Sequence, residues 1–151
     1  MLPRSGAIRV AVRGLVMHDN RLLLVNAWAD HRAALWCAPG GGAEAHSALP
    51  DNLAREIYEE TGLRAQIGAV CLVNEFHDQA RGFHQVEIFF RCTVADRSID
   101  PEWRDPEGVV KSRIWVNRDE IADLTVKPSC LAEVAWQESD LTYDPLEPLL
   151  G

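Results

Sequence analysis

The sequence predicts a sandwich of the α/β or α+β class, in which a mixed β-sheet is covered by helices. Runs rich in β-branched and apolar residues outnumber helical patterns, and the longest helical pattern stands between such runs. The 151 residues suit one domain. We therefore expect a single domain over residues 1–151, with an irregular tail at about 140–151.

A hairpin is expected to open the sheet. Residues 7–17 are rich in β-branched side chains and partly alternate, which is typical of a strand. Residues 18–20 read His-Asp-Asn, and Asp and Asn tolerate the left-handed backbone of a tight turn. Residues 21–27 form the return strand, and its three consecutive leucines indicate burial on both faces.

Three consecutive glycines, Gly40 to Gly42, follow a short apolar strand predicted at residues 34–38. They indicate either unusual backbone angles in a turn, with close approach to another group, or a plain flexible loop. Apolar residues at four-residue spacing then predict an amphipathic helix over residues 48–61. Ser47 is its candidate N-cap and Gly62 its stop.

The second half of the chain predicts shorter elements around a polar loop at residues 96–111, which is rich in Asp, Glu and Pro. These elements are strands at residues 64–75, 83–94 and 112–116, a turn at 77–82, a helical turn at 119–124 and a helix at 128–138. The order of these elements fits the sandwich described above.

The charge pattern excludes some partners. A formal net charge of −8 repels a nucleic-acid polymer but permits small anionic substrates beside divalent cations. No stretch reaches the roughly 20 apolar residues of a membrane helix, and no membrane partner is expected. Four cysteines without C-x-x-C spacing favour reduced thiols, so we expect a cytoplasmic location.

The predicted helix carries a carboxylate cluster. Glu56 and Glu60 lie four residues apart on one face, with Glu59 beside them. Like charges at this spacing destabilise a helix, and a hard cation such as Mg²⁺ or Mn²⁺ neutralises them. Arg55 can orient a carboxylate through a two-pronged hydrogen bond. The alternative is a solvated acidic face with a surface salt bridge.

This segment resembles the box of the Nudix hydrolases, G-x5-E-x7-R-E-U-x-E-E-x-G-U, where U is bulky and apolar. The match begins at Gly41 and includes Arg55-Glu56-Ile57-Tyr58-Glu59-Glu60-Thr61-Gly62-Leu63. Ser47 stands where the family has Glu, and His46 replaces a common Gly. The chain therefore resembles the family with one degenerate box position.

The resemblance implies a Nudix-type α/β/α sandwich with a mixed sheet, of the α/β class, and possible homodimers. It implies hydrolysis of a phosphoanhydride in a nucleoside diphosphate linked to another moiety, with Mg²⁺ or Mn²⁺. The implied metal ligands are Glu59 and Glu60, helped by Glu56 and the Gly41 carbonyl, while Arg55 orients carboxylates. The expected partner is a small nucleotide-type molecule.

Ser47 lacks the charge that the family places before the helix, so Arg55 needs another partner, and Glu44 is the candidate. Two outcomes stay open. One is an active enzyme with weaker metal affinity, and the other is a weakened domain that binds a nucleotide metabolite as a sensor. We expect the first, because all three helix carboxylates are present.

The general base is not fixed by the box. The candidates are Glu56 and Glu59 of the helix, Glu87 within an apolar strand, and the loop acids Glu107, Glu102 and Asp105. The Gly40, Gly41 and Gly42 backbone and His84 are candidates for contact with the substrate, and Trp28 and Phe83 for stacking on a base. For each, a solvated surface position or ordinary packing is the alternative.

Overall fold

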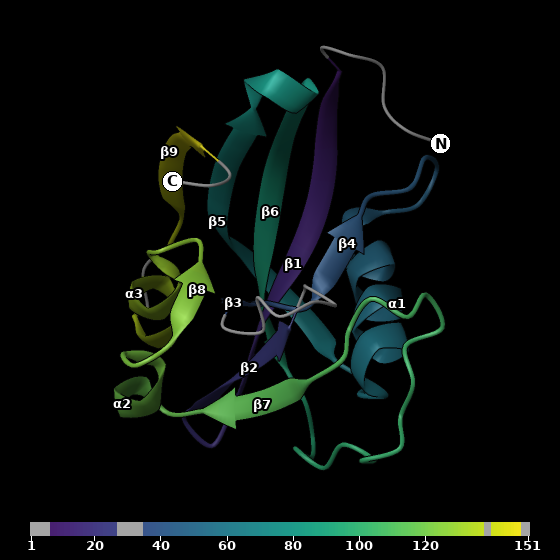
Figure 1. Cartoon of the computed structure of the whole chain (residues 1–151). Helices are drawn as coiled ribbons and strands as arrows, with labels where there is room; N and C mark the ends of the chain where they lie inside the picture. Colours follow the sequence, from purple (N-terminus) through teal and green to yellow (C-terminus); the bar gives the residue numbers. More distant parts are fainter. Residues whose placement is uncertain (1–6, 27–34, 138–139, 149–151) are drawn as a thin grey trace.

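A computed structural model describes residues 7–26, 35–137 and 140–148 (Figure 1). The expected strand at residues 34–38 is present in its described part, and Trp28 lies outside the described residues. The strands are β1 Ile8–His18, β2 Arg21–Asn26, β3 Leu35–Cys37, β4 Gly40–Gly42, β5 Gln66–Asp78, β6 Phe83–Thr93, β7 Arg113–Val116, β8 Thr125–Lys127 and β9 Thr142–Pro148. The helices are α1 Leu49–Thr61, α2 Arg118–Ile121 and α3 Leu131–Trp136, with a 3₁₀ turn η1 at Gln79–Arg81.

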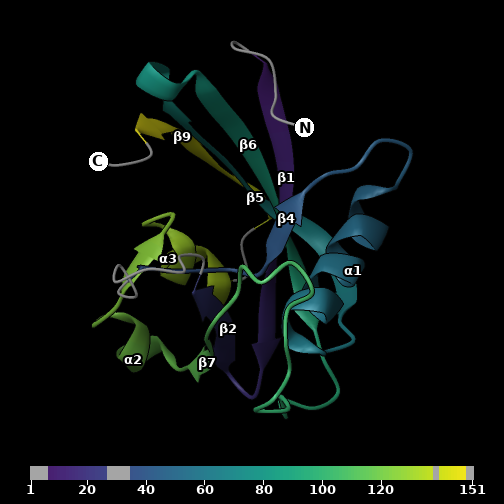
Figure 2. The same cartoon turned by 45° about the vertical axis from the view of Figure 1, so that its right-hand side comes forward.

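One mixed sheet forms the middle layer, in the order β8-β3-β2-β1-β6-β5-β9, with β4 added to β1 and β7 to β2. β1 runs parallel to β6, whereas β5 and β6 are antiparallel. Helix α1 covers one side of this sheet, and α2 and α3 lie on the other (Figures 1 and 2). The predicted α/β sandwich with a mixed sheet is confirmed.

Two apolar clusters fill the layers on either side of β2. Leu23 packs under α1 with Leu53 and Ile57, while Leu22 and Leu24 pack with α2 and α3. All three β2 leucines are fully buried. The burial predicted from the leucine run on both strand faces is therefore correct.

The hairpin turn and the end of α1 follow their local sequence. Asp19 and Asn20 take positive φ angles of 49° and 61°. Gly62 ends α1 in the left-handed conformation, with φ 77°, and its N–H donates to the Tyr58 carbonyl. Both positions were predicted from residue type, because a side chain with a Cβ is disfavoured at such angles unless it is Asn or Asp.

Gly40–Gly42 is not a plain flexible loop but the short strand β4, antiparallel to β1, so the alternative of close approach to another group is the one that the structure bears out. One local prediction was wrong. Ser47 does not cap α1, whose N-cap is Ala48 without a side-chain hydrogen bond. Ala48 has no side-chain acceptor, and Pro50, three residues after Ser47, has no N–H that a Ser47 cap could accept.

The irregular tail predicted at residues 140–151 was also wrong, since β9 pairs parallel with β5. Prolines at the edge of a sheet do not remove a needed ladder bond, so Pro145 and Pro148 are tolerated there. The Asn74 side chain donates to Asp144 at 2.7 Å across this pairing. In the described part of the chain, no helix is long and apolar enough to cross a membrane.

Candidate active site

The glycine strand β4 lies where no side chain fits. A Cβ on Gly40 would overlap the Val12 carbonyl, and its φ is +153°. A Cβ on Gly41 would stand 2.8 Å from the Glu56 carboxyl carbon. The glycines therefore allow β4 to lie against β1 on one side and against the acidic helix on the other.

Asn52 holds the segment after β4 onto α1. Its side chain is fully buried, accepts a hydrogen bond from the Glu44 N–H at 2.8 Å and donates to the Gly42 carbonyl at 3.3 Å. These two bonds fix the glycine strand and the carboxylates of α1 relative to each other. Sequence reasoning missed Asn52, because its type gives no signal without its partners.

An acidic cavity of about 320 Å³ opens between β4, α1 and the loop after β6. Glu56 and Glu60 of α1 line it together with Glu107 and Asp105 of that loop. Arg9 and Arg13 of β1 stand on its wall. Carboxylates separated by about fifty residues in the sequence thus surround one cavity beside two cations.

Glu60 is the most deeply buried carboxylate of this cavity. The Gly40 N–H donates to its two oxygens at 3.4 and 3.3 Å. Burial raises the pKa of Glu60 to about 8, against the lowering effect of Arg13 and of this hydrogen bond. Burial likewise raises the pKa of Glu56, against the effect of Arg55 and with help from the field of Glu107. For both carboxyls, the neighbouring positive charge is too small to offset the effect of burial on the pKa.

Arg55 has the partners that the box predicts, with one substitution. Its guanidinium lies 3.1 Å from the Glu44 carboxylate, 3.3 Å from Glu59 and 3.5 Å from Glu56. The prediction that Glu44 supplies the charge missing at Ser47 is thereby confirmed as a contact. The Glu59 carboxylate is occupied by Arg55 and does not line the acidic cavity.

The loop after β6 presents its carboxylates in different ways. Asp105 is buried and accepts from the backbone N–H groups of Glu107, Val109 and Val110, so it shapes the loop. The exposed Glu107 lines the cavity. Glu102 does not line it. Of the loop acids, Glu107 is therefore the one whose side chain is available beside Glu56.

Trp103 connects this loop to α1. Its indole N–H donates to the Glu59 carbonyl at 2.9 Å, and its ring packs edge-on against Tyr58 at a centroid distance of 5.3 Å. A Cβ on Gly62 would stand 2.9 Å from the same ring. The placement of Glu107 thus depends on contacts with the end of α1.

Glu87 is engaged rather than free. It is buried in β6, where the Arg13 Nε donates to it at 2.7 Å and the Gln85 amide at 3.1 Å. Glu87 and burial act in opposite directions on Arg13, whose pKa is raised overall. The structure therefore makes Glu87 the fixed partner of Arg13, outside the lining of the acidic cavity.

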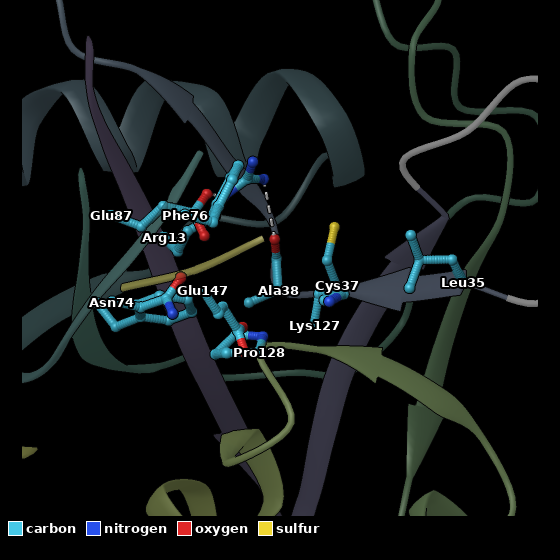
Figure 3. A pocket seen from close by; sticks show the side chains of 11 residues that line it. Arg13, Leu35, Cys37, Ala38, Asn74, Phe76, Glu87, Lys127, Pro128 and Glu147 are labelled. Atoms are coloured by element: carbon cyan, nitrogen blue, oxygen red, sulfur yellow. Dashed lines mark hydrogen bonds and ion pairs between the residues drawn. The ribbon is translucent and has the colours of Figure 1, made fainter. Parts of the chain in front are cut away.

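A second, largely apolar cavity of about 110 Å³ shares Arg13 with the acidic cavity, and Figure 3 shows the side chains that line it. It is lined by side chains of β1, β3, β5, β6, β8 and β9, among them Leu35, Asn74, Phe76 and Phe89. Arg13 and Cys37 line both cavities. The two cavities therefore meet at the Arg13 guanidinium, which also donates to the Ala38 carbonyl at 3.2 Å.

Phe83 and His84 are not brought to either cavity. Phe83 packs on Phe76 with ring centroids 5.8 Å apart, and His84 lies 3.7 Å from the Glu75 carboxylate. They lie at the end of β6 next to η1, away from α1 (Figure 1). Of this aromatic pair, Phe76 is the one that reaches the apolar cavity.

Arg9 and Arg13 were not singled out from the sequence. Both occur in β1 at a spacing of four, which places them on one strand face. Two arginines on one face of an otherwise apolar strand are a signal that could have been used. Arg9 also donates to the Gln85 side chain at 3.1 Å.

The residues fit a hard divalent cation. Across the described ranges, no three His, Cys, Asp or Glu side chains gather closely enough to form a ready metal cage. The cavity instead offers Glu56, Glu60 and Glu107 around its wall. Mg²⁺ keeps several waters and uses one or two carboxylates, so this arrangement suits it better than an all-protein cage.

The sandwich, the glycine strand and the buried acidic helix define the Nudix class of fold and site. The chain belongs to the Nudix family, because the NUDIX domain model matches residues 7–135, most of its length. A NUDIX hydrolase from Nitrosomonas europaea has the same fold, with a TM-score of 0.70 at 21% identity over 85% of this chain and 86% of that one.

Two curated relatives are similar in sequence. The putative ADP-ribose pyrophosphatase YjhB of Bacillus subtilis is 32% identical over 88 residues, which are 56% of this chain and 41% of that protein. The ADP-ribose pyrophosphatase of Methanocaldococcus jannaschii is 31% identical over 85 residues, 56% of this chain and 50% of that protein. The matched stretches thus span half or less of these relatives.

Proposed function

We propose that this protein is a divalent-metal-dependent pyrophosphohydrolase that cleaves a phosphoanhydride in a nucleoside diphosphate linked to another moiety. The observation that carries this proposal is the meeting of the acidic cavity and the apolar cavity at Arg13. The relatives named ADP-ribose pyrophosphatases support this substrate class.

The ligands proposed for Mg²⁺ or Mn²⁺ are Glu56, Glu60 and the Gly41 carbonyl, whose residues line the acidic cavity. Glu59 is proposed as a further ligand from the family resemblance alone, since its carboxylate contacts Arg55 outside that lining. A bound cation would neutralise pyrophosphate oxygens and lower the pKa of a water molecule. Arg55 and Glu44 keep the helix carboxylates oriented, since their charges lie 3.1 Å apart. Gly41 leaves the space that a side chain would take from Glu56.

Two cations are available for the anionic part of the substrate. Arg13 is held by Glu87 and the Ala38 carbonyl, so its position is fixed before any substrate binds. Arg9 stands beside it on the same strand face and lines the acidic cavity. We assign both to phosphate oxygens, because guanidinium groups donate in a fork that matches them. The apolar cavity then receives an organic moiety of the substrate.

Glu107 is our candidate for the general base. It is exposed, lines the acidic cavity and lies close enough to Glu56 to raise that group's pKa. A base must accept a proton from water near the scissile phosphorus, which requires a carboxylate that is free of other partners. Glu87 is excluded from this role by its ion pair with Arg13.

The second candidate function is a nucleotide-metabolite sensor with weakened catalysis. The observation behind it concerns the partner of Arg55. Because Ser47 carries no charge, Glu44 pairs with Arg55 instead, and the Glu44 side chain is 64% exposed, so solvent screens its charge more strongly. In that case the protein binds its ligand without turnover.

The test is a substrate panel with Mg²⁺ or Mn²⁺ containing ADP-ribose, nucleotide sugars, dinucleoside polyphosphates and nucleoside triphosphates. The enzyme hypothesis expects turnover that falls about 100-fold or more in Glu107→Gln and in Glu59→Gln. Glu133→Gln, an exposed carboxylate on α3 that lines none of these cavities, is the control and keeps its activity. Tight binding without turnover would favour the sensor. The absence of both binding and turnover would contradict both functions.

A further inference from the structure

A third cavity, of about 560 Å³, lies against the loop that carries Glu107. Its lining comes from residues 101–113, and two of these residues, Asp105 and Val110, also line the acidic cavity. Figure 2 shows the loop passing beside α1 before it enters β7. This cavity is separate from the metal and substrate positions assigned above.

Three cations line this cavity: Arg104, Lys111 and Arg113. Within the part of the chain that the structure describes, none of them forms an ion pair. The Arg113 Nε donates to the Glu60 carbonyl, whereas its Nη2 is buried without a hydrogen-bond acceptor. A buried donor without an acceptor is uncommon in folded proteins and destabilising.

Two carboxylates, Asp105 and Glu102, line the cavity without forming ion pairs to its three cations in the described residues. Asp105 is occupied by three backbone N–H groups of its own loop. Glu102 is exposed and forms no ion pair with the cavity's cations in the described residues. Three cations against two carboxylates leave the lining with a net charge of +1, a local excess of positive charge in a chain whose net charge is −8.

We propose that this cavity binds a phosphate group, either as inorganic phosphate or as a phosphate monoester. Arg104, Lys111 and Arg113 donate to its oxygens. A neutral ligand would leave the excess charge of the cavity in place. A phosphate group supplies both the charge and enough acceptor oxygens for all three cations.

Binding there also orders the loop that carries Glu107. Arg113 connects the cavity to the Glu60 carbonyl, and Asp105 fixes the N–H groups of Val109 and Val110. Slower amide exchange at these two valines is therefore expected when phosphate binds. Any effect of this ordering on turnover rests on the proposed function, whereas phosphate binding does not.

The test is calorimetric titration of the full chain with inorganic phosphate, and separately with AMP, in EDTA at low salt. EDTA removes metal, so phosphate cannot be held at the carboxylates through a cation. We expect both probes to bind in the millimolar range or tighter, and the double variant Arg104→Gln/Lys111→Gln to bind about tenfold more weakly. Both side chains are exposed, so the variant is expected to fold.

Arg81→Gln is the matched control, because Arg81 is an exposed cation in η1 at the opposite end of the sheet from the loop. It should leave phosphate binding unchanged. The proposal is overturned if neither probe binds up to about 20 mM. Binding of AMP alone supports the monoester only if the double variant weakens it, and overturns the proposal if it does not. The proposal is equally overturned if Arg9→Gln abolishes binding while the double variant does not. Unchanged exchange at Val109 and Val110 would refute the ordering of the loop.

Discussion

Replacing Glu60 by Gln should stabilise the metal-free protein at pH 8. Glu60 is buried in the acidic cavity, and its pKa is raised to about 8 from an ordinary 4.5. A carboxyl with a raised pKa holds its proton more tightly in the folded state than in the unfolded state. Its contribution to stability is thus fully present below pH 4.5 and is lost as the pH rises to about 8.

The size of the effect follows from this difference in pKa. At about 1.4 kcal/mol per pKa unit, the charged form of Glu60 destabilises the metal-free fold by at most about 5 kcal/mol. The cavity is open on one side, so water relieves part of this cost, and we expect about 2 kcal/mol. Gln keeps an oxygen for the Gly40 N–H, which limits other losses.

The assay is urea unfolding in EDTA at pH 5 and pH 8, for the wild type and Glu60→Gln. The two proteins should differ little at pH 5, and the variant should be more stable at pH 8. Glu133→Gln, an exposed carboxylate on α3, is the control without a change. Adding Mg²⁺ at pH 8 should stabilise the wild type more than the variant. A variant less stable than the wild type at pH 8 in EDTA would refute the argument.

Three further predictions concern the surroundings of the site. Asn52→Ala should destabilise the fold by about 2–3 kcal/mol in urea unfolding, because it removes the partners of the Gly42 carbonyl and the Glu44 N–H; an unchanged midpoint would contradict this. Glu44→Gln should weaken Mn²⁺ binding about two- to fivefold by calorimetry, because Arg55 then competes for the helix carboxylates. Adding Ser47→Glu to this variant should restore the affinity. If the double variant binds Mn²⁺ as weakly as Glu44→Gln alone, Glu44 does not replace the missing charge at Ser47. Burial raises the pKa of the Cys37 thiol to about 11 and that of Cys92 to about 12. Alkylation of these thiols in the folded protein at pH 8 should therefore be about 100-fold slower than after unfolding, and its rate should rise about tenfold per pH unit. Equal alkylation rates in the folded and unfolded protein would contradict the raised pKa values.

Local signals accounted for the elements that matter most to the site. The four-residue apolar spacing gave α1, Gly62 its end, and the leucine run the burial of β2 on both faces. Each of these depends on neighbours within one or two turns of the chain, which the sequence displays directly. The partner of Arg55 was also accessible, because Glu44 is near it in sequence.

Pairing between distant segments was less accessible. β9 pairs with β5, about seventy residues away, and β4 pairs with β1. Both β4 and β9 are short and contain glycine or proline, so their own sequences do not indicate a strand. The missing Ser47 cap has a local cause, the proline in the first turn of α1. A strand without strong alternation needs its partner to define it.

The sequence by itself predicted the acidic helix with its carboxylate cluster and gave the family resemblance. The tertiary structure alone decided which carboxylates surround one cavity, because Glu107 joins Glu56 there from a separate loop, which Trp103 connects to α1. The tertiary structure also showed that Glu87 is the hydrogen-bonded partner of Arg13, which leaves it unsuited to accept a proton from water. Spacing along a helix fixes which side chains share a face, whereas contacts between separate strands and loops depend on the packing of the whole sheet.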